Sequence, residues 1–122
     1  MPKLKRGDVW QADFTPQIHK EEPGKRCRPA LILQVNLLND AGHSTTVVVA
    51  GTTNIYRDKQ GDGFPLRVPI GKIGEAKMET DLLIDQIRAI SNQRFIGDRP
   101  IASLARAQLK RVEEALKLLI FQ

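Results

Sequence analysis

Residues 7–14, with the sequence GDVWQADF, alternate apolar and polar side chains as a half-buried strand does. Trp10, Ala12 and Phe14 fall on one face of this strand. The other face carries Val9, followed by two polar side chains. We therefore expect an N-terminal strand whose aromatic face is turned towards the core.

Two further strands are expected at residues 29–35 and 45–51. The first, PALILQV, is nearly all apolar and begins with a proline, which is typical of a buried central strand. The second, TTVVVAG, is rich in the β-branched residues that favour strands. Residues 38–44, LNDAGHS, lie between them and predict a hairpin connection. Together these segments predict an antiparallel core.

Two later segments are less regular. Residues 64–70, FPLRVPI, resume the alternation, but Pro65 and Pro69 restrict this segment to a sheet edge or to the start of a strand. Residues 81–90, DLLIDQIRAI, also alternate as a strand does, although a helix fits their apolar positions as well. Strand and helix both remain open for this segment.

The C-terminal segment has the period of an amphipathic helix. Its apolar residues recur mostly at spacings of three and four, and Glu113 precedes Lys117 by four residues. The apolar positions are Leu104, Leu109, Val112, Leu116, Leu119 and Ile120. About five short strands and one helix predict a mainly β, α+β fold, a small bent antiparallel barrel that the helix closes. The 122 residues, 1–122, are expected to form a single domain.

The charge of the chain adds a candidate partner. There are 19 Lys and Arg residues against 14 Asp and Glu residues, so the formal net charge is +5 and the pI is near 9.7. This excess favours association with phosphate groups. Residues 15–27 and 52–63 are polar and without a period, which predicts two long exposed loops, a common location of functional residues. Nucleic acid is therefore a candidate partner.

The remaining composition favours a cytoplasmic protein. No apolar run approaches the roughly 20 residues of a membrane span, so no membrane association is expected. The basic N-terminus is not followed by the apolar segment of a secretory signal. A single cysteine, Cys27, cannot form an internal disulfide. His19, Cys27 and His43 lack the spacing of a metal site, and we expect neither a metal nor a cofactor.

Several segments in order resemble one known family. These are RGDVWQADFTP, RPALILQ, AGTTN and DLLIDQIRAISNQRF, and they cover most of the chain. They are similar to the MazF/PemK family of toxin endoribonucleases. The resemblance implies an SH3-like barrel closed by a C-terminal helix, a homodimer, and metal-independent, sequence-specific cleavage of single-stranded RNA such as mRNA, which inhibits translation and growth. It also implies a cognate antitoxin with an acidic C-terminal tail.

The resemblance implies positions for the catalytic groups. The family's catalytic arginine directly precedes the proline of the second strand, which corresponds to Arg28, and its catalytic threonine follows the third strand, which corresponds to Thr52. A guanidinium can donate two hydrogen bonds to a phosphate and keeps its charge. A hydroxyl can donate to a nonbridging oxygen. The implied reaction leaves 2',3'-cyclic phosphate and 5'-hydroxyl ends.

RNA contacts are expected from the long loop before Arg28, from the residues after Thr52 and from the segment 81–90. The expected RNA-binding residues are Lys25, Arg26, Thr53, Asn54, Tyr56, Gln86, Glu22 and His19. The first loop is slightly longer than in the family's relatives, so Glu21 and Glu22 both stay candidates for one family position. Because histidine titrates near neutral pH, His19 is also a candidate base.

Simpler interpretations of the same residues stay open at this point. An arginine at the start of a strand, such as Arg28, is usually solvated. Thr52 and Thr53 are common turn formers after a strand. Phe14 fits core packing better than base stacking, whereas Tyr56 suits either use.

Two other functions fit the same predicted fold. Small barrels also bind RNA without catalysing a reaction. A gyrase poison of this fold is a third alternative, but such poisons act through a C-terminal tryptophan. This chain ends in KLLIFQ and has its one tryptophan at position 10.

Overall fold

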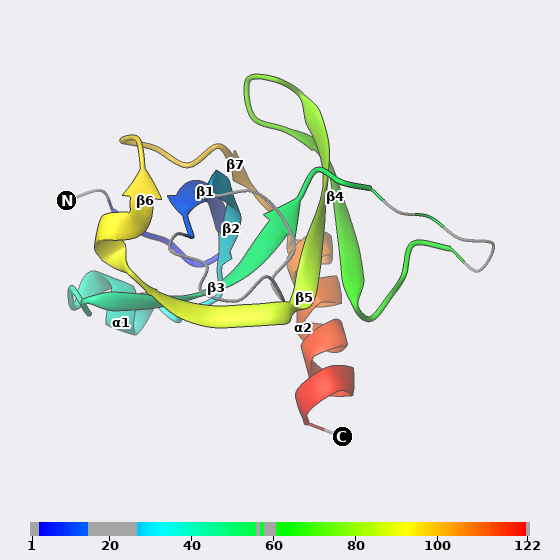
Figure 1. Ribbon diagram of the computed structural model, residues 1–122. Coiled ribbons are helices and arrows are strands. Elements are labelled where there is room, and N and C mark those ends of the chain that lie inside the picture. Colours follow the sequence, from blue (N-terminus) through cyan, green and yellow to red (C-terminus); the bar gives the residue numbers. More distant parts are fainter. Residues whose placement is uncertain (1–2, 15–26, 56, 58–60, 122) are drawn as a thin grey trace.

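The computed structural model describes residues 3–14, 27–55, 57 and 61–121. In chain order the elements are β1 (Asp8–Asp13), β2 (Cys27–Ile32), α1 (Asn36–Asp40), β3 (Thr45–Thr52), β4 (Arg67–Ile73), β5 (Met78–Ser91), a short 3-10 helix (Asn92–Arg94), β6 (Phe95–Ile96), β7 (Ala102–Ser103) and α2 (Arg106–Ile120). The strands form one antiparallel sheet in the order β4-β5-β3-β2-β1-β6, and β7 pairs with β1 (Figure 1).

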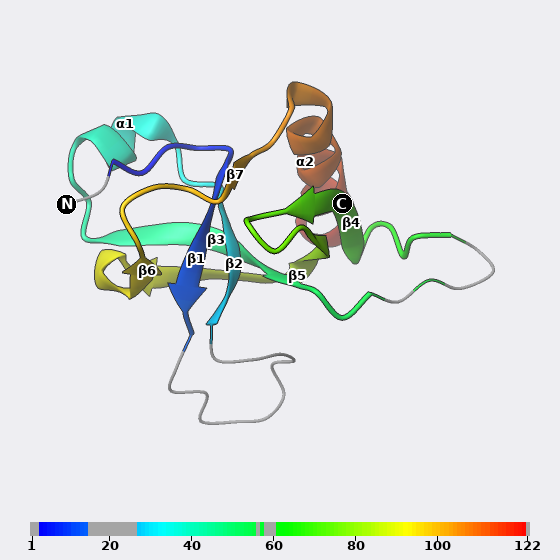
Figure 2. The same ribbon diagram turned by 90° about the horizontal axis from the view of Figure 1, so that it is seen from above.

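The long strand β5 gives the sheet its curvature. β5 has 14 residues and pairs with both β3 and β4. Val49 of β3 lies opposite Ile87, but Gly51 lies opposite Leu82, so β5 has extra residues at this point. Such an excess bends a strand and increases its twist. The sheet therefore curls into a nearly closed barrel, as the two views in Figures 1 and 2 show, and the predicted mainly β fold is confirmed.

Both faces of the central strands are buried. One core cluster contains Trp10, Ala30 and Val48, whereas their chain neighbours Val9, Leu31 and Val49 belong to a second cluster on the opposite face. This explains why β2 and β3 are almost continuously apolar in sequence. It also corrects the expectation for the first strand, because Val9 on its supposed outer face is completely buried.

Helix α2 covers the second of these clusters. Its buried residues, Val112 and Ala115, pack with Val68 of β4 and Leu82 of β5. The predicted C-terminal helix is thus confirmed. The helix continues beyond the sheet, as Figure 1 shows, so Leu119 and Ile120 are 38% and 49% exposed, which corrects their predicted place on a covered face.

The connection between β2 and β3 differs from the predicted hairpin at 38–44. It contains the five-residue helix α1. Asparagine side chains stabilise this turn: Asn36 Oδ1 accepts from the Arg6 amide at 2.8 Å, and Asn39 Nδ2 donates to the Gln34 carbonyl at 3.0 Å. Such local side-chain bonds offer the backbone an alternative to a tight turn.

The other predicted segments agree with the structure in type, although their bounds differ. Residues 81–90 lie within β5, so the helical alternative for them is wrong. The segment 64–70 contributes the start of β4, and β4 is an edge strand as Pro65 and Pro69 indicated. The two-residue strands β6 and β7 were not predicted. In the described part of the chain, no helix has the length and apolar character needed to cross a bilayer.

Candidate active site

Arg28 is the second residue of β2 and is only 4% exposed. Its Nε donates a 3.1 Å hydrogen bond to the Gly51 carbonyl of β3. Its Cζ lies 5.5 Å from the centroid of the Phe14 ring, within the range of a cation–π contact. The alternative that Arg28 is a solvated arginine at the start of a strand is therefore wrong, because its guanidinium is buried and held in place.

Thr52 is the last residue of β3 and is 9% exposed. Its Oγ1 accepts a 3.1 Å hydrogen bond from the backbone amide of Asn54, which closes a local turn. A hydroxyl has two acceptor lone pairs and one proton to donate. With one lone pair engaged by Asn54, the Thr52 hydroxyl proton can still be donated to another acceptor.

Gly51 stands between these two groups in a tightly packed place. A Cβ atom on Gly51 would lie 3.2 Å from Pro29 Cβ, 3.3 Å from Thr80 Cγ2 and 3.4 Å from the Asp81 carbonyl oxygen. Glycine therefore allows β3 to approach both of its neighbours closely at the point where Arg28 meets Thr52.

A large open groove of ≈ 1300 Å³ runs along this edge of the barrel. One wall is formed by Arg28 and by residues 51–54. The ends of β4 and β5 with the turn between them, residues 72–78, and the segment 99–103 form most of the rest. Among the described residues, four cations line the groove, Arg28, Lys72, Lys77 and Arg99, against one carboxylate, Glu75. The excess of positive charge suits a polyanion.

A buried carboxylate lies directly behind the Thr52 end of the groove. Asp81 of β5 is the register partner of Thr52 and is 0% exposed. Arg57 donates to both of its oxygens, at 2.6 and 2.9 Å, and Arg67 donates to Oδ2 at 3.0 Å. Burial alone would raise the pKa of Asp81, but the hydrogen bonds from Arg57 and Arg67 outweigh it and lower this pKa. The bond to Asp81 raises the pKa of Arg57.

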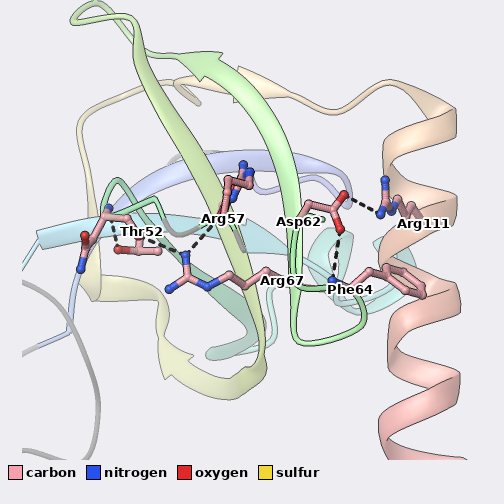
Figure 3. A network of polar contacts seen from close by, with 8 residues as sticks. Thr52, Arg57, Asp62, Phe64, Arg67 and Arg111 are labelled. Atoms are coloured by element: carbon pink, nitrogen blue, oxygen red, sulfur yellow. Dashed lines mark hydrogen bonds and ion pairs between the residues drawn. The ribbon is translucent and has the colours of Figure 1, made fainter. Parts of the chain in front are cut away.

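The connection between β3 and β4 is fixed to helix α2 at the end that precedes β4. Asp62 Oδ1 accepts from the Phe64 amide at 3.2 Å, and Asp62 Oδ2 accepts from Arg111 at 2.7 Å. The Arg111 Cζ also lies 4.9 Å from the centroid of the Phe64 ring. Figure 3 shows the two groups of side chains, Thr52, Arg57 and Arg67 at one end and Asp62, Phe64 and Arg111 at the other.

Comparison with known proteins identifies the family. Residues 5–120 match the family described as the PemK-like, MazF-like toxin of type II toxin-antitoxin systems. This chain belongs to the PemK/MazF toxin family. It is 34% identical over 119 residues to the endoribonuclease EndoA of Bacillus subtilis, an alignment that covers 94% of this chain and 92% of the relative. It is 28% identical over 120 residues to the endoribonuclease MazF9 of Mycobacterium tuberculosis, covering 94% of each.

Solved structures share the fold of this PemK/MazF toxin. MazF from Deinococcus radiodurans superposes with a TM-score of 0.72 at 22% identity and covers 100% of both chains. A mycobacterial endoribonuclease in complex with its cognate antitoxin has a TM-score of 0.68 at 19% identity, covering 99% of this chain and 96% of that one. The SH3-like barrel expected from the sequence is thus the fold of known MazF structures.

The structure of this PemK/MazF toxin brings together part of the predicted site. Arg28, Thr52, Thr53 and Asn54 all line the groove. Gln86 is half-buried on β5 and is not among the described residues that line it. The predictions for Lys25, Arg26, His19, Glu22 and Tyr56 lie outside the described residues, as does the choice between Glu21 and Glu22.

Phe14 is 2% exposed and serves the core of this PemK/MazF toxin, as expected. The Cζ of Arg88 lies 5.6 Å from its ring centroid, so Phe14 is in contact with Arg88 as well as with Arg28. The Phe14 ring therefore contacts guanidinium groups from two different strands, β2 and β5.

Sequence reasoning missed two parts of this PemK/MazF toxin's site. The groove cations Lys72, Lys77 and Arg99 come from the end of β4 and from two turns, and their approach to Arg28 depends on the curl of the sheet. Asp81 was assigned to a strand without a function. The available signal was a charged residue at the start of the apolar run DLLI. An aspartate buried in such a run needs ionic partners.

Proposed function

We propose that this protein is the toxin of a type II toxin–antitoxin system and that it cleaves single-stranded RNA without a metal at the groove beside Arg28 and Thr52. The observation that carries the proposal is the buried Arg28 guanidinium, which bonds the carbonyl directly before Thr52 at the edge of a basic groove that Thr52 also lines. It is supported by 34% identity to an endoribonuclease over 94% of the chain.

RNA contains its own nucleophile, so the protein needs only a few groups. The 2'-oxygen forms a bond to the adjacent phosphorus while the bond from phosphorus to the 5'-oxygen breaks. The 2'-hydroxyl gives up its proton and the departing 5'-oxygen gains one, so that a 2',3'-cyclic phosphate and a 5'-hydroxyl result. The protein must align the 2'-hydroxyl and stabilise the charge that develops on the phosphoryl oxygens.

Arg28 stabilises this charge in the proposed reaction. Its Nε is already committed to Gly51, which fixes the plane of the guanidinium before RNA binds. A preorganised cation in a place with little solvent acts more strongly than one in water and needs no reorientation during the reaction. An arginine keeps its proton under ordinary conditions, so we assign Arg28 electrostatic stabilisation rather than proton transfer.

Thr52 donates its hydroxyl proton to a nonbridging phosphoryl oxygen in this scheme. Thr53 and Asn54 follow it along the groove and contact the RNA, together with Lys72, Lys77 and Arg99. Lys25, Arg26, Glu22, His19, Tyr56 and Gln86 remain proposed RNA-binding residues.

The test is cleavage of a mixed-sequence single-stranded RNA in the presence of EDTA. We expect products with 5'-hydroxyl ends from the wild-type protein and no cleavage by Arg28→Ala. RNA that stays intact with folded wild-type protein would contradict the proposal and favour a binding module without catalysis. End-mapping of the products identifies the sequence motif. If the protein does not affect DNA relaxation by gyrase, the gyrase-poison alternative is excluded.

We further propose a homodimer, a cognate antitoxin and a cytoplasmic location, where mRNA is accessible. The antitoxin's acidic C-terminal tail lies along the basic groove and blocks it. Gel filtration at the 13.7 kDa mass of one chain would contradict the dimer. An acidic peptide from the neighbouring gene product should compete with RNA, and failure to compete would count against this mode of inhibition.

A further inference from the structure

A continuous path of hydrogen bonds links the buried Asp81 to the hydroxyl of Thr52. Arg67 Nη1 donates to Asp81 Oδ2 at 3.0 Å and to the Asn54 carbonyl oxygen at 3.0 Å. The Asn54 amide in turn donates to Thr52 Oγ1 at 3.1 Å. Arg67 therefore holds Asn54 through its carbonyl oxygen, and Asn54 holds Thr52 through its amide. Figure 3 shows Arg67 and Thr52 at the two ends of this part of the path.

This path restricts the rotation of the Thr52 hydroxyl. The Asn54 amide occupies one lone pair of Oγ1, so a rotation of the side chain about its first torsion would break that bond. The bond depends on the position of Asn54, which is fixed through its carbonyl by Arg67. The Thr52 Oγ1 is consequently held in one position before a substrate arrives.

Neither Asp81 nor Arg67 is among the described residues that line the groove. Asp81 is 0% exposed and stands opposite Thr52 in the pairing of β3 with β5. A group so enclosed has no route to a bound RNA and can act on the reaction only through its neighbours.

We propose that Asp81 and Arg67 are positioning residues for the ribonuclease reaction: their ion pair fixes Asn54, and Asn54 holds the Thr52 hydroxyl in the orientation that donates to the phosphate. This inference rests on the proposed function of Thr52. Arg57 has a supporting part, because it holds both oxygens of Asp81 and keeps the carboxylate in place.

The structure offers a test variant and a matched control that act at different places in the chain. Arg67→Met removes the contact to Asn54 but leaves Asp81 paired with Arg57, so the buried charge stays compensated. Arg111→Gln removes the ion pair with Asp62, which lies in the connection between β3 and β4 at the end away from Asn54. Both variants loosen this connection, but only the first touches the path to Thr52.

The activity experiment is a double-mutant cycle with Thr52→Val, measured as single-turnover cleavage. Arg67→Met should lower the rate constant about tenfold in the wild-type background and less than about twofold in the Thr52→Val background, because the orientation of an absent hydroxyl does not matter. Its effect on the RNA dissociation constant should stay within about twofold. Arg111→Gln should change the cleavage rate constant by the same factor in both backgrounds. An equal loss for Arg67→Met in both backgrounds would overturn the proposal.

A second measurement does not depend on activity. The Asn54 amide should exchange with solvent about tenfold faster in Arg67→Met and in Thr52→Val than in the wild type, and at the wild-type rate in Arg111→Gln. Arg67→Gln replaces Arg67→Met if the latter does not fold. An unchanged Asn54 exchange rate in the Arg67 variant would refute the positioning path. If the wild-type protein leaves RNA intact, the proposed function fails, while the exchange rates still decide whether Arg67 holds Asn54.

Discussion

The Nε of Arg28 donates a 3.1 Å hydrogen bond to the carbonyl oxygen of Gly51, the residue that directly precedes Thr52. One contact between neighbouring strands thus places a buried cation beside a hydroxyl group. The geometry does not depend on the loop that precedes Arg28, because both partners belong to the regular sheet. The candidate active site is therefore built on two strands of the sheet.

Arg28→Lys is expected to reduce RNA cleavage by about 10²-fold or more, although the positive charge is kept. A lysine cannot reproduce the planar guanidinium that bonds Gly51 and a phosphate at the same time. Single-turnover cleavage in EDTA measures the rate, and RNA binding should change by less than about threefold. Cleavage within about twofold of the wild-type rate would show that charge alone is sufficient at this position.

Thr52→Val is expected to lower the cleavage rate constant by about 10²- to 10³-fold, the usual cost of removing one donor to a developing oxyanion. Valine has nearly the same shape as threonine, so the fold should be preserved. Thr45→Val is the matched control, because Thr45 is half-buried at the opposite end of β3 and is not among the described residues that line the groove. Equal losses in both variants would contradict a specific role for the Thr52 hydroxyl.

The groove cations should contribute to affinity rather than to the chemical step. Lys72→Gln, Lys77→Gln and Arg99→Gln are each expected to weaken RNA binding and to reduce the slope of log K against log salt by about 0.7, one phosphate contact to a single strand. Titrations at several salt concentrations measure this slope. Lys110→Gln, on an exposed part of α2 outside the groove, should leave it unchanged.

Asp81→Asn is expected to destabilise the fold by about 3 kcal/mol at pH 7, because it leaves Arg57 and Arg67 without their buried counter-charge. The folded-state pKa of Asp81 lies below its usual value of 3.8. The ionised carboxylate therefore contributes stability above about pH 4, and this contribution is lost as the pH falls through the lowered folded-state pKa.

Urea unfolding of wild type and Asp81→Asn across the acidic range tests this linkage. The difference in unfolding free energy should be largest near neutral pH and should shrink below about pH 4, as the wild-type carboxyl becomes protonated. A difference of the same size at pH 7 and at the acid limit would show that the charge of Asp81 is not the source of its effect.

The sequence predicted what depends on local pattern. The apolar runs of β2 and β3 and the period of α2 follow from burial. Arg28 and Thr52 were identified through the resemblance to the MazF/PemK family, because the local pattern alone predicts only a solvated arginine and a turn-forming threonine. The approach of Lys72, Lys77 and Arg99 to that pair depends on how far β5 bends at its irregular register with β3. No short window of sequence contains that information. The pairing of Asp81 with Arg57 and Arg67 was missed for the same reason, because it joins residues 24 and 14 positions apart.

The packing around Gly51 has a consequence for the genetics of this protein. A substitution can abolish the activity of a protein by altering a reactive side chain or by unfolding the chain. A methyl group at Gly51 would do neither; it would press against Pro29 and Thr80 and widen the spacing between strands that sets Arg28 beside Thr52. Under the proposed function, Gly51→Ala should therefore abolish toxicity in a bacterial host, while a folded, full-length protein that retains Arg28 and Thr52 accumulates.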